Sequence, residues 1–358
     1  MRVTFVLPGY PKHPVGGYKV AYEYANALVE AGHHVSILQS RYFEGSPAGG
    51  PRRGVKYLAG AVQLAMNRAN RPNWFPLDPR VAVRTVLRLR ESDVPTADVV
   101  IATSCVTAPF VAGLPASAGS SVYFLQHFED WDAPREFVES TWRLPMHRIV
   151  IAKWLGAKAT ELGVDFEYVA NAVDPVGFPP GPPIEDRPLA ISAMVSDIPW
   201  KRADLVVSVL GSLKKRLPGL QATTFGTTDA PSGLPDYVTH VRKPDRSTLQ
   251  RIYQQSRVYL CASDGEGWHL PPAEAMLSGA ALVSTRIDGV TEYADGVASF
   301  AEPGDAGDLE EKAFALLTDL AVNSSLALAG QSALRTYTPR DASDSFIAAL
   351  ARASADPR

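Results

Sequence analysis

The sequence predicts an α/β protein with two doubly wound, Rossmann-like domains, and three observations support this prediction. The chain has 358 residues, more than a single hydrophobic core usually holds. Short apolar runs alternate with longer amphipathic runs along both halves, a pattern typical of parallel sheets covered by helices. Between the halves, residues 175–183 include five prolines and favour an extended linker. We therefore expect domains at 1–174 and 175–338, and a C-terminal helix at about 339–358 that packs back on the first domain.

The first half opens with a βαβ unit. An apolar run at 3–7 predicts a strand, the periodic run at 18–31 predicts a helix that Gly32 ends, and 35–39 predicts the next strand. Further strands are expected at 99–102, 122–125, 149–151 and 167–170.

The second half repeats this alternation. Strands are expected at 189–194, 221–225, 238–242, 258–262 and 281–284. Helices are expected at 203–217 and 245–255, and a further helix follows residue 269 and closes at Ser278-Gly279. Open α/β sheets bind ligands beyond the carboxyl ends of their strands, so the cleft between the two domains is the expected ligand site.

Composition and charge bound the class of protein. Hydrophobic residues make up 46% and charged residues 20%, and the net charge of −3 gives no indication of a nucleic-acid partner. Basic residues nevertheless outnumber acidic residues by nine to one from Arg52 to Arg90. If 80–90 is a helix, Arg80, Arg84 and Arg88 share one face, which suits contact with anionic lipid or an acidic acceptor. The alternative is an ordinary solvated face.

The two cysteines, Cys105 and Cys261, lie far apart in apolar stretches and form neither a disulfide framework nor a metal-binding pattern. The apolar run at residues 1–9 is too short for a signal peptide or a membrane span. We therefore expect a cytoplasmic protein, in peripheral contact with the inner membrane face if the basic segment binds lipid.

Two loops have the residue types that bind phosphate. Gly16 and Gly17 follow the first strand, where paired glycines let the backbone approach a phosphate, although plain turn formation is the alternative. Neither a dinucleotide-binding fingerprint nor a P-loop is present. In the second half, Lys201 and Arg202 follow the first strand and suit a departing diphosphate, or else they are solvated charges at the start of a helix.

Two glutamates flank the turn between a strand and a helix late in the chain. Glu266 and Glu274 are eight positions apart, with glycine and proline residues between them. The N-terminus of the helix favours an anion, and the carboxylates can accept hydrogen bonds from sugar hydroxyls.

The segment EGWHLPPAEAM at 266–276 resembles the Glu-x7-Glu signature of retaining GT-B glycosyltransferases of family 4. Gly16-Gly17 resembles the glycine loop of that family, 170–174 resembles its linker segment, and 289–292 resembles its Gly-Gly-x-x-Glu segment. The resemblance implies a GT-B fold and transfer of a hexosyl unit from a nucleotide diphosphate sugar, with no metal and no further cofactor.

The resemblance also implies roles for single residues. Glu274 would hold the ribose hydroxyls and Glu266 the donor sugar, while Gly16, Gly17 and Lys201 would bind the diphosphate. The family's arginine is absent, because Val195 and Ser196 occupy its expected position, and Arg202 is the candidate to replace it.

The loop between the glutamates would bind the donor as well. The loop contains Gly267 and Trp268. The amides of the next two residues, His269 and Leu270, would face the sugar and the phosphate. Outside this loop, Lys243 would flank the base. His269 replaces the family's usual glycine, so a side chain there would narrow the donor pocket or add a hydrogen-bond partner.

The loop after the strand at 122–125 is the expected counterpart in the first half. His127 lies where the family often has a histidine beside the donor sugar; the alternative is a histidine satisfied by backbone contacts. Asp130 and Trp131 are expected acceptor contacts, because a carboxylate accepts from hydroxyls and an indole packs on a sugar ring. Asp130-Trp131-Asp132 also matches the short metal motif of GT-A enzymes, which we interpret as chance.

The sequence thus predicts a metal-independent retaining glycosyltransferase with His127, Lys201 and Glu266 as its catalytic residues. The acceptor is a glycan, a lipid or a small molecule, and a rhamnosyl donor is one option because some rhamnosyltransferases look like this outline. Two alternatives remain: a nucleotide-sugar 2-epimerase, and a catalytically silent protein that binds nucleotide sugars or glycans.

Overall fold

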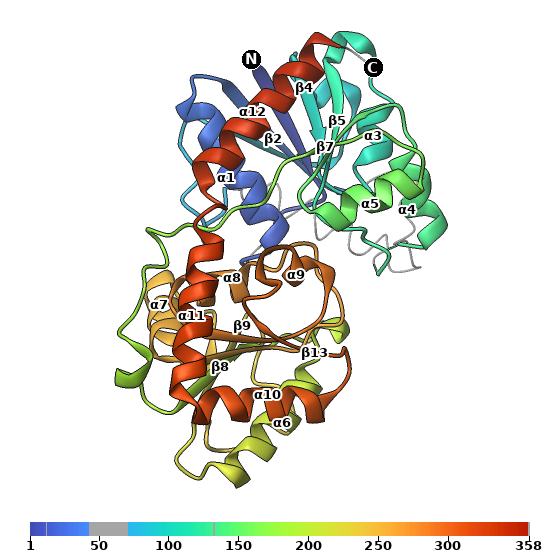
Figure 1. The fold of residues 1–358 in the computed structure, drawn as a ribbon. Coiled ribbons are helices and arrows are strands. Elements are labelled where there is room, and N and C mark those ends of the chain that lie inside the picture. Colours follow the sequence, from blue (N-terminus) through green and yellow to red (C-terminus); the bar gives the residue numbers. More distant parts are fainter. Residues whose placement is uncertain (12, 43–70, 132, 357–358) are drawn as a thin grey trace. The chain divides into compact units, whose positions relative to one another are not determined.

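The computed structural model describes residues 1–11, 13–42, 71–131 and 133–356. The chain divides into two compact units: unit 1 comprises Met1–Ala170 with Arg340–Arg358, and unit 2 comprises Asn171–Pro339. Each unit contains one parallel sheet with flanking helices (Figure 1). The predicted α/β class with two Rossmann-like domains is confirmed.

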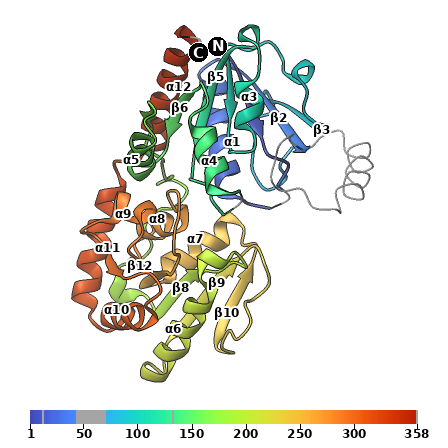
Figure 2. The ribbon, with the colours of Figure 1, turned by 90° about the vertical axis from the view of Figure 1, so that its right-hand side faces the viewer.

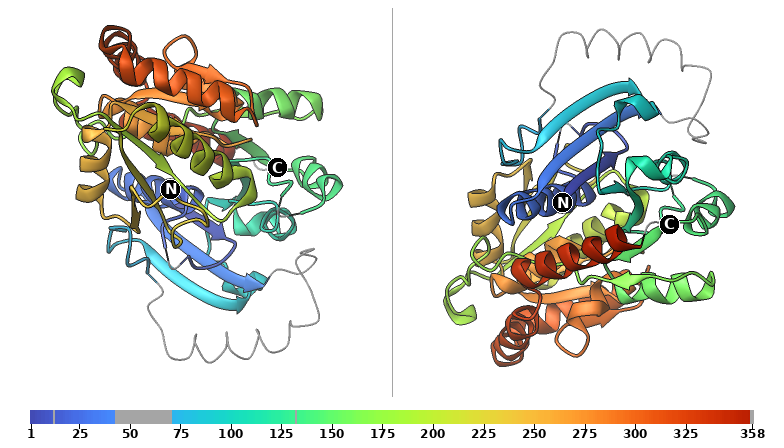
Figure 3. Two further views of the ribbon diagram at one scale, coloured as in Figure 1. Left: turned by 90° about the horizontal axis from the view of Figure 1, so that it is seen from below. Right: turned by 90° about the horizontal axis from the view of Figure 1, so that it is seen from above.

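Unit 1 contains a seven-stranded sheet in the order β3-β2-β1-β4-β5-β6-β7, with all neighbouring strands parallel. Strand order reverses between β1 and β4, and β2 and β3 lie side by side at one edge (Figure 3). Its elements are β1 (Arg2–Leu7), α1 (Gly16–Glu30), β2 (His34–Tyr42), β3 (Ala82–Arg88), β4 (Val99–Ala102), α3 (Ala108–Ala112), β5 (Ser120–Leu125), α4 (Arg135–Trp142), β6 (His147–Val150), α5 (Lys153–Glu161), β7 (Glu167–Tyr168) and α12 (Pro339–Ala355).

The predicted basic helix at 80–90 is wrong, because this segment forms the edge strand β3. A spacing of four residues places side chains on one face of a strand as well as of a helix, so the arginine pattern did not distinguish the two. Arg80 pairs with Asp78 at 2.8 Å and Arg84 with Asp93 at 2.6 Å. The basic residues from 52 to 68 lie outside the described residues.

Membrane-spanning potential is low in the described part of the chain. No single helix there has both the length and the apolar content of a span, although α10 (Ala306–Thr318) and the helical stretch Leu320–Ala355 reach that composition together across a 102° bend.

The C-terminal helix α12 belongs to the core of unit 1 and lies beside α1 (Figure 1). The Phe346 ring stacks on Tyr24 of α1, with centroids 4.0 Å apart, and also contacts Phe5 and Phe124 of the sheet. Burial of these aromatic rings ties the end of the chain to its first strand.

Unit 2 contains a six-stranded parallel sheet in the order β10-β9-β8-β11-β12-β13 (Figure 2). Strand order reverses between β8 and β11. Its elements are β8 (Ala190–Met194), α6 (Ala203–Arg216), β9 (Gln221–Gly226), β10 (Val238–Arg242), α7 (Arg246–Gln255), β11 (Val258–Cys261), α8 (Leu270–Leu277), β12 (Ala281–Thr285), α9 (Asp288–Ala294), β13 (Ser299–Ala301), α10 and α11 (Leu320–Leu334).

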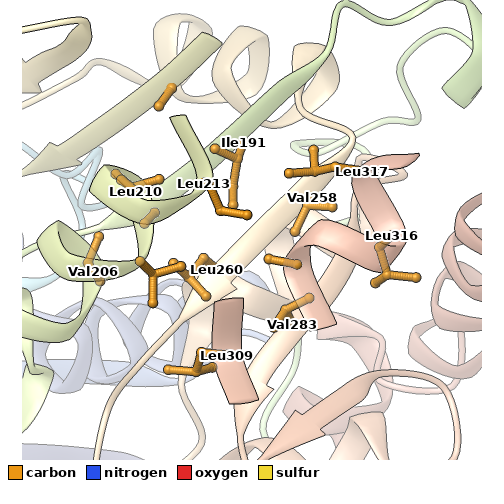
Figure 4. Packing of buried hydrophobic residues seen from close by; sticks show 14 of the residues in the cluster. Ile191, Val206, Leu210, Leu213, Val258, Leu260, Val283, Leu309, Leu316 and Leu317 are labelled. Carbon is orange, nitrogen blue, oxygen red and sulfur yellow. The ribbon is translucent and has the colours of Figure 1, made fainter. Parts of the chain in front are cut away.

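Branched aliphatic side chains fill the space between this sheet and its helices (Figure 4). Ile191, Leu260 and Val283 come from three adjacent strands, and Leu210 and Leu309 come from α6 and α10. Strands that are buried on both faces explain why the sequence shows continuous apolar runs here.

The proline-rich stretch at 175–183 lies within unit 2, after the observed division at residue 170. Arg187, only 3% exposed, donates to the carbonyls of Pro182 at 2.9 Å, Ser256 at 2.7 Å and Ser278 at 2.9 Å. Burial lowers the pKa of Arg187 to about 10. Backbone carbonyls therefore satisfy this buried cation and hold the stretch against α7 and α8.

Replacing Phe346 by alanine should lower the free energy of unfolding by about 3–5 kcal/mol, because it removes a ring enclosed by aromatic neighbours. Urea unfolding followed by far-ultraviolet circular dichroism measures the loss. Ser345→Ala, an exposed change on the same helix, should stay within about 0.5 kcal/mol of the wild type. A loss below about 1 kcal/mol for Phe346→Ala would mean that α12 does not support unit 1.

Candidate functional site

The candidate site in unit 2 lies where strand order reverses. β8 and β11 are parallel neighbours, with Ile191 opposite Val258, so the loops after both strands emerge at the same edge. Lys201 comes from the short helical turn after β8, and Glu266 comes from the loop after β11. The topology thus brings together two residues that are 65 positions apart in sequence.

Lys201 and Glu266 form a largely buried ion pair through Nζ and Oε1. The lysine side chain is 16% exposed and the glutamate side chain 9%. Burial alone would raise the pKa of Glu266, but the neighbouring His269 and the Lys201 ammonium lower it. Because His269 is itself neutral at pH 7, the Lys201 ammonium and a hydrogen bond with the Ser263 side chain keep this carboxylate ionised.

His269 is the residue before α8 and places its imidazole beside this ion pair. Its side chain is 4% exposed, and Nε2 lies 3.6 Å from Glu266 Oε1. Burial lowers the pKa of His269 to about 3, with Lys201 adding to this effect and Glu266 opposing it.

The loop before α8 is supported from behind by α9. A Cβ atom on Gly289 would lie 2.4 Å from the Glu266 carbonyl oxygen, so only glycine permits this approach. Tyr293 donates its hydroxyl to the His269 carbonyl at 2.9 Å, and its ring packs on Trp268 at 4.5 Å between centroids. Trp268, buried in this cluster, anchors the loop.

Glu274 lies on α8 and is buried. The hydroxyl of Tyr253, from α7, donates to Glu274 Oε2 at 3.2 Å. Burial, and then the charge of Glu274, raises the pKa of Tyr253 well above its usual value, so the phenol stays protonated. This hydrogen bond fixes the orientation of the carboxylate.

The other predicted cations in unit 2 have different surroundings. Arg202 adopts a left-handed conformation with φ of 50° and pairs with Asp204 at 2.9 Å and Asp264 at 3.2 Å. These carboxylates raise its pKa, and they already neutralise its charge. Lys243 is exposed at the end of β10, and its amide donates to the Gly226 carbonyl at 2.7 Å.

In unit 1, the two predicted glycines form the start of α1. The Gln126 side chain, which follows β5, donates to the Gly17 carbonyl at 3.0 Å. A Cβ atom on Gly17 would touch this amide at ordinary distances, and one on Gly16 would meet nothing within 4 Å. Crowding within the protein therefore does not explain glycine at position 16.

His127 follows β5, and its imidazole contacts other residues of unit 1. Its Nδ1 accepts from the Phe128 amide at 2.8 Å. Its ring meets Trp131 edge-on at 4.0 Å and Trp154 at 5.6 Å between centroids. Asp130 is exposed, and Trp131 is 42% exposed, so both lie at the surface of the loop.

Residues 187–319 match the family model described as glycosyl transferases group 1. This segment holds Lys201, Glu266, His269 and Glu274. The matched segment lies within unit 2. No curated protein sequence matches the chain.

Solved structures share the whole architecture at low sequence identity. HepE from Anabaena in complex with UDP-glucose has a TM-score of 0.72 and 13% identity, and the match covers 98% of this chain and 100% of that chain. A TarM variant from S. aureus, with Fondaparinux, alpha-GlcNAc-glycerol and UDP, has a TM-score of 0.72 and 10% identity over 98% and 100%. Sucrose-phosphate synthase from Thermosynechococcus elongatus has a TM-score of 0.70 and 14% identity over 98% of each chain. The fold is therefore GT-B.

Three residues of unit 2 that shape the site were not predicted from sequence. Tyr253, Cys261 and Tyr293 contact Glu274 or His269. Each lies in an apolar or amphipathic run where it looks like any core residue, so no sequence signal identifies it. Gly289 stood in a recognised segment, but its steric role needs the fold.

Replacing Lys201 by methionine should reverse the way in which the stability of unit 2 depends on pH. In the wild type, the lowered pKa of Glu266 adds stability at neutral pH that is lost as the pH falls through that pKa. Lys201→Met leaves an uncompensated carboxylate and should cost about 3–5 kcal/mol at pH 7.5. The carboxylate then has a raised pKa, so the loss should shrink towards pH 5, as urea unfolding at both values can measure.

The matched control is Lys312→Met, which breaks a partly exposed pair with Asp308 on α10. This change should alter stability by no more than about 0.5 kcal/mol at either pH. A loss in Lys201→Met that is equally small would contradict a buried, coupled pair.

Proposed function

We propose that the protein is a retaining glycosyltransferase that transfers a hexosyl unit from a nucleotide diphosphate sugar to a glycan, lipid or small-molecule acceptor. The observation that carries the proposal is the Lys201–Glu266 pair beside α8, at the reversal point of a glycosyltransferase group 1 domain. Structures of similar fold hold UDP-glucose or UDP. They support a nucleotide sugar as the donor.

Lys201 stabilises the leaving diphosphate in this proposal. Negative charge on the diphosphate grows as the glycosidic bond breaks, so an ammonium that is already in place favours the transition state over the ground state. The pair with Glu266 orients the ammonium before the donor binds. Lysine supplies the positive charge here, so the proposed transfer needs no metal ion.

The N-terminus of α8 adds a limited number of donors. Leu270 is the first helical residue, and Pro271 and Pro272 follow it, so two of the first amides do not exist. The amides of His269 and Leu270 remain as the proposed contacts for sugar and phosphate. The helix dipole acts in the same direction.

The two carboxylates have separate tasks in the proposed enzyme. Glu274, oriented by Tyr253, accepts hydrogen bonds from the ribose hydroxyls, and Glu266 contacts the donor sugar. Glu266 is engaged by Lys201, which argues against a role as covalent nucleophile. We therefore propose that the acceptor attacks from the side on which the diphosphate leaves, which retains the anomeric configuration.

The loop after β5 is the proposed acceptor and donor-sugar contact in unit 1. His127 accepts at Nδ1 from the Phe128 amide, so Nε2 is the ring nitrogen that can donate to a hydroxyl. The exposed indole of Trp131 offers a stacking face, and Asp130 offers an acceptor.

Thermal shift with a panel of uridine, deoxythymidine and guanosine diphosphate sugars identifies the donor, because a ligand that binds the native state raises Tm. Transfer assays with that donor then test the site. Lys201→Ala should lower kcat by about 100-fold or more, since it removes a charge that acts on the transition state. Glu274→Gln should mainly raise the donor KM, because the ribose is bound in both states.

Lys312→Ala, on the exposed face of α10, is the control and should transfer at the wild-type rate. Wild-type rates in both site variants would refute the assignment. An epimerised donor in reactions without acceptor would instead identify a 2-epimerase, and binding without any turnover would identify a silent binding protein.

A further inference from the structure

His269 contains a buried donor that lacks a hydrogen-bond partner within the described residues. Its side chain is 4% exposed, and Nε2 makes no hydrogen bond there. The facing oxygen, Glu266 Oε1, lies 3.6 Å away, beyond hydrogen-bonding distance. A buried polar group left in this way costs about 1–3 kcal/mol, so its position calls for a functional explanation.

The contacts of the ring favour the tautomer with its proton on Nε2. Nδ1 lies 3.3 Å from the Cys261 sulfur. Burial raises the pKa of the Cys261 thiol, so the thiol keeps its proton and can donate it to Nδ1. Neutral imidazole has one N–H group, and with Nδ1 as acceptor this group is Nε2–H, which faces Glu266.

In the proposed reaction, Glu266 and the donor diphosphate compete for the ammonium of Lys201. Lys201 is its hydrogen-bonded partner, and the proposed function assigns the same ammonium to the donor diphosphate. When Lys201 turns to the phosphates, Glu266 loses a donor in a buried place. A carboxylate shift of about 1 Å or less then brings Oε1 within hydrogen-bonding distance of His269 Nε2.

We propose that His269 is a positioning residue for Glu266: its Nε2–H takes over the carboxylate when Lys201 turns to the diphosphate of the donor. The inference rests on the proposed function, because only a diphosphate ligand competes for Lys201 in this way. His269 thereby keeps Glu266 ionised and aimed at the donor sugar in the loaded enzyme.

The groups around the imidazole are consistent with this exchange. Glu266 from its own loop, Lys201 from the turn after β8 and Cys261 from β11 face the ring. Tyr293 from α9 holds the backbone carbonyl of His269. With φ of 25°, the backbone of His269 adopts a conformation that disfavours side chains, and this cost fits a residue retained for its imidazole.

Two variants of similar size separate a hydrogen-bond donor from a space-filling group. His269→Gln keeps an amide N–H near the position of Nε2, whereas His269→Leu fills the space without a donor. With the donor selected by thermal shift, His269→Leu should lose at least about 10-fold in kcat, with donor KM changed by less than about threefold. His269→Gln should stay within about threefold of the wild-type kcat.

The pH profile gives a readout that a purely structural role would not change. Without the donor from His269, the pKa of Glu266 in the loaded enzyme rises, so the acidic limb of kcat should move to higher pH in His269→Leu and not in His269→Gln. Equal kcat and equal acidic limbs in the wild type and both variants would overturn the inference. An equal loss in both variants, with matching falls in Tm, would also overturn it in favour of packing.

Spectroscopy of 15N-histidine-labelled protein tests the exchange without turnover. We expect one imidazole, absent from His269→Leu, with Nδ1 unprotonated, Nε2 protonated and no titration between pH 5 and 8. Saturating UDP, dTDP or GDP, matched to the selected donor, should shift its Nε2 resonance. An Nδ1-protonated ring, or an Nε2 resonance unchanged by bound nucleotide, would overturn the inference.

Failure of the proposed function gives a different result. In that case the wild-type protein binds no nucleotide sugar and transfers nothing, and the inference falls with it. If the wild type binds and transfers while His269→Leu matches it in every measurement, the inference alone is wrong.

Discussion

The parallel pairing of β8 with β11 is the constraint on which the site of unit 2 depends. Ile191 lies opposite Val258 and Ala193 opposite Leu260, and these side chains belong to one buried core. A slip by one residue would move each side chain to the opposite face, which is also buried and packed differently, so the core fixes the register. The register in turn fixes where the loops after β8 and β11 emerge, and so it brings Lys201 into contact with Glu266.

Burial of the Lys201–Glu266 ion pair has a desolvation cost, and the rest of the site reduces it. Removing two charges from water is expensive, and a buried ion pair often contributes little net stability. The structure limits the cost by leaving Lys201 partly exposed and by keeping the adjacent imidazole of His269 neutral. A second cation at that position would compete for Glu266, whereas a neutral ring supplies a donor and no charge. The site thus has one positive charge and one neutral polar group around the same carboxylate.

Most of the fold could be predicted from the sequence, because apolar runs and helical periodicity report burial directly. The exception is β3, where arginines four residues apart fit either secondary structure and an edge position removes the apolar alternation. The proline-rich stretch was recognisable as extended chain. Its attachment to unit 2 was not, because that depends on Gln250 and Gln254 donating to the carbonyls of Gly177 and Pro179.

The candidate site likewise has residues that could be predicted from the sequence and features that could not. Residues such as Lys201, Glu266 and Glu274 could be named in advance, because their charge and their place after strands are visible in the sequence. The orientation of His269 could not, because it depends on Cys261 from a neighbouring strand and on Tyr293 from α9. The tautomer and the protonation state of this imidazole depend on contacts between elements that are distant in the chain. The local sequence does not predict such contacts.

Unit 2 starts and finishes at one point: the amide of Val173 donates to the carbonyl of Tyr337 at 3.1 Å. The polypeptide therefore leaves unit 1 after residue 170, completes an entire second unit, and returns through neighbouring positions to form α12. A segment with adjoining ends can be cut out or exchanged as a cassette without stretching the remainder. Recombination at these two junctions would join unit 1 to a different version of unit 2, so the two units can vary independently of each other.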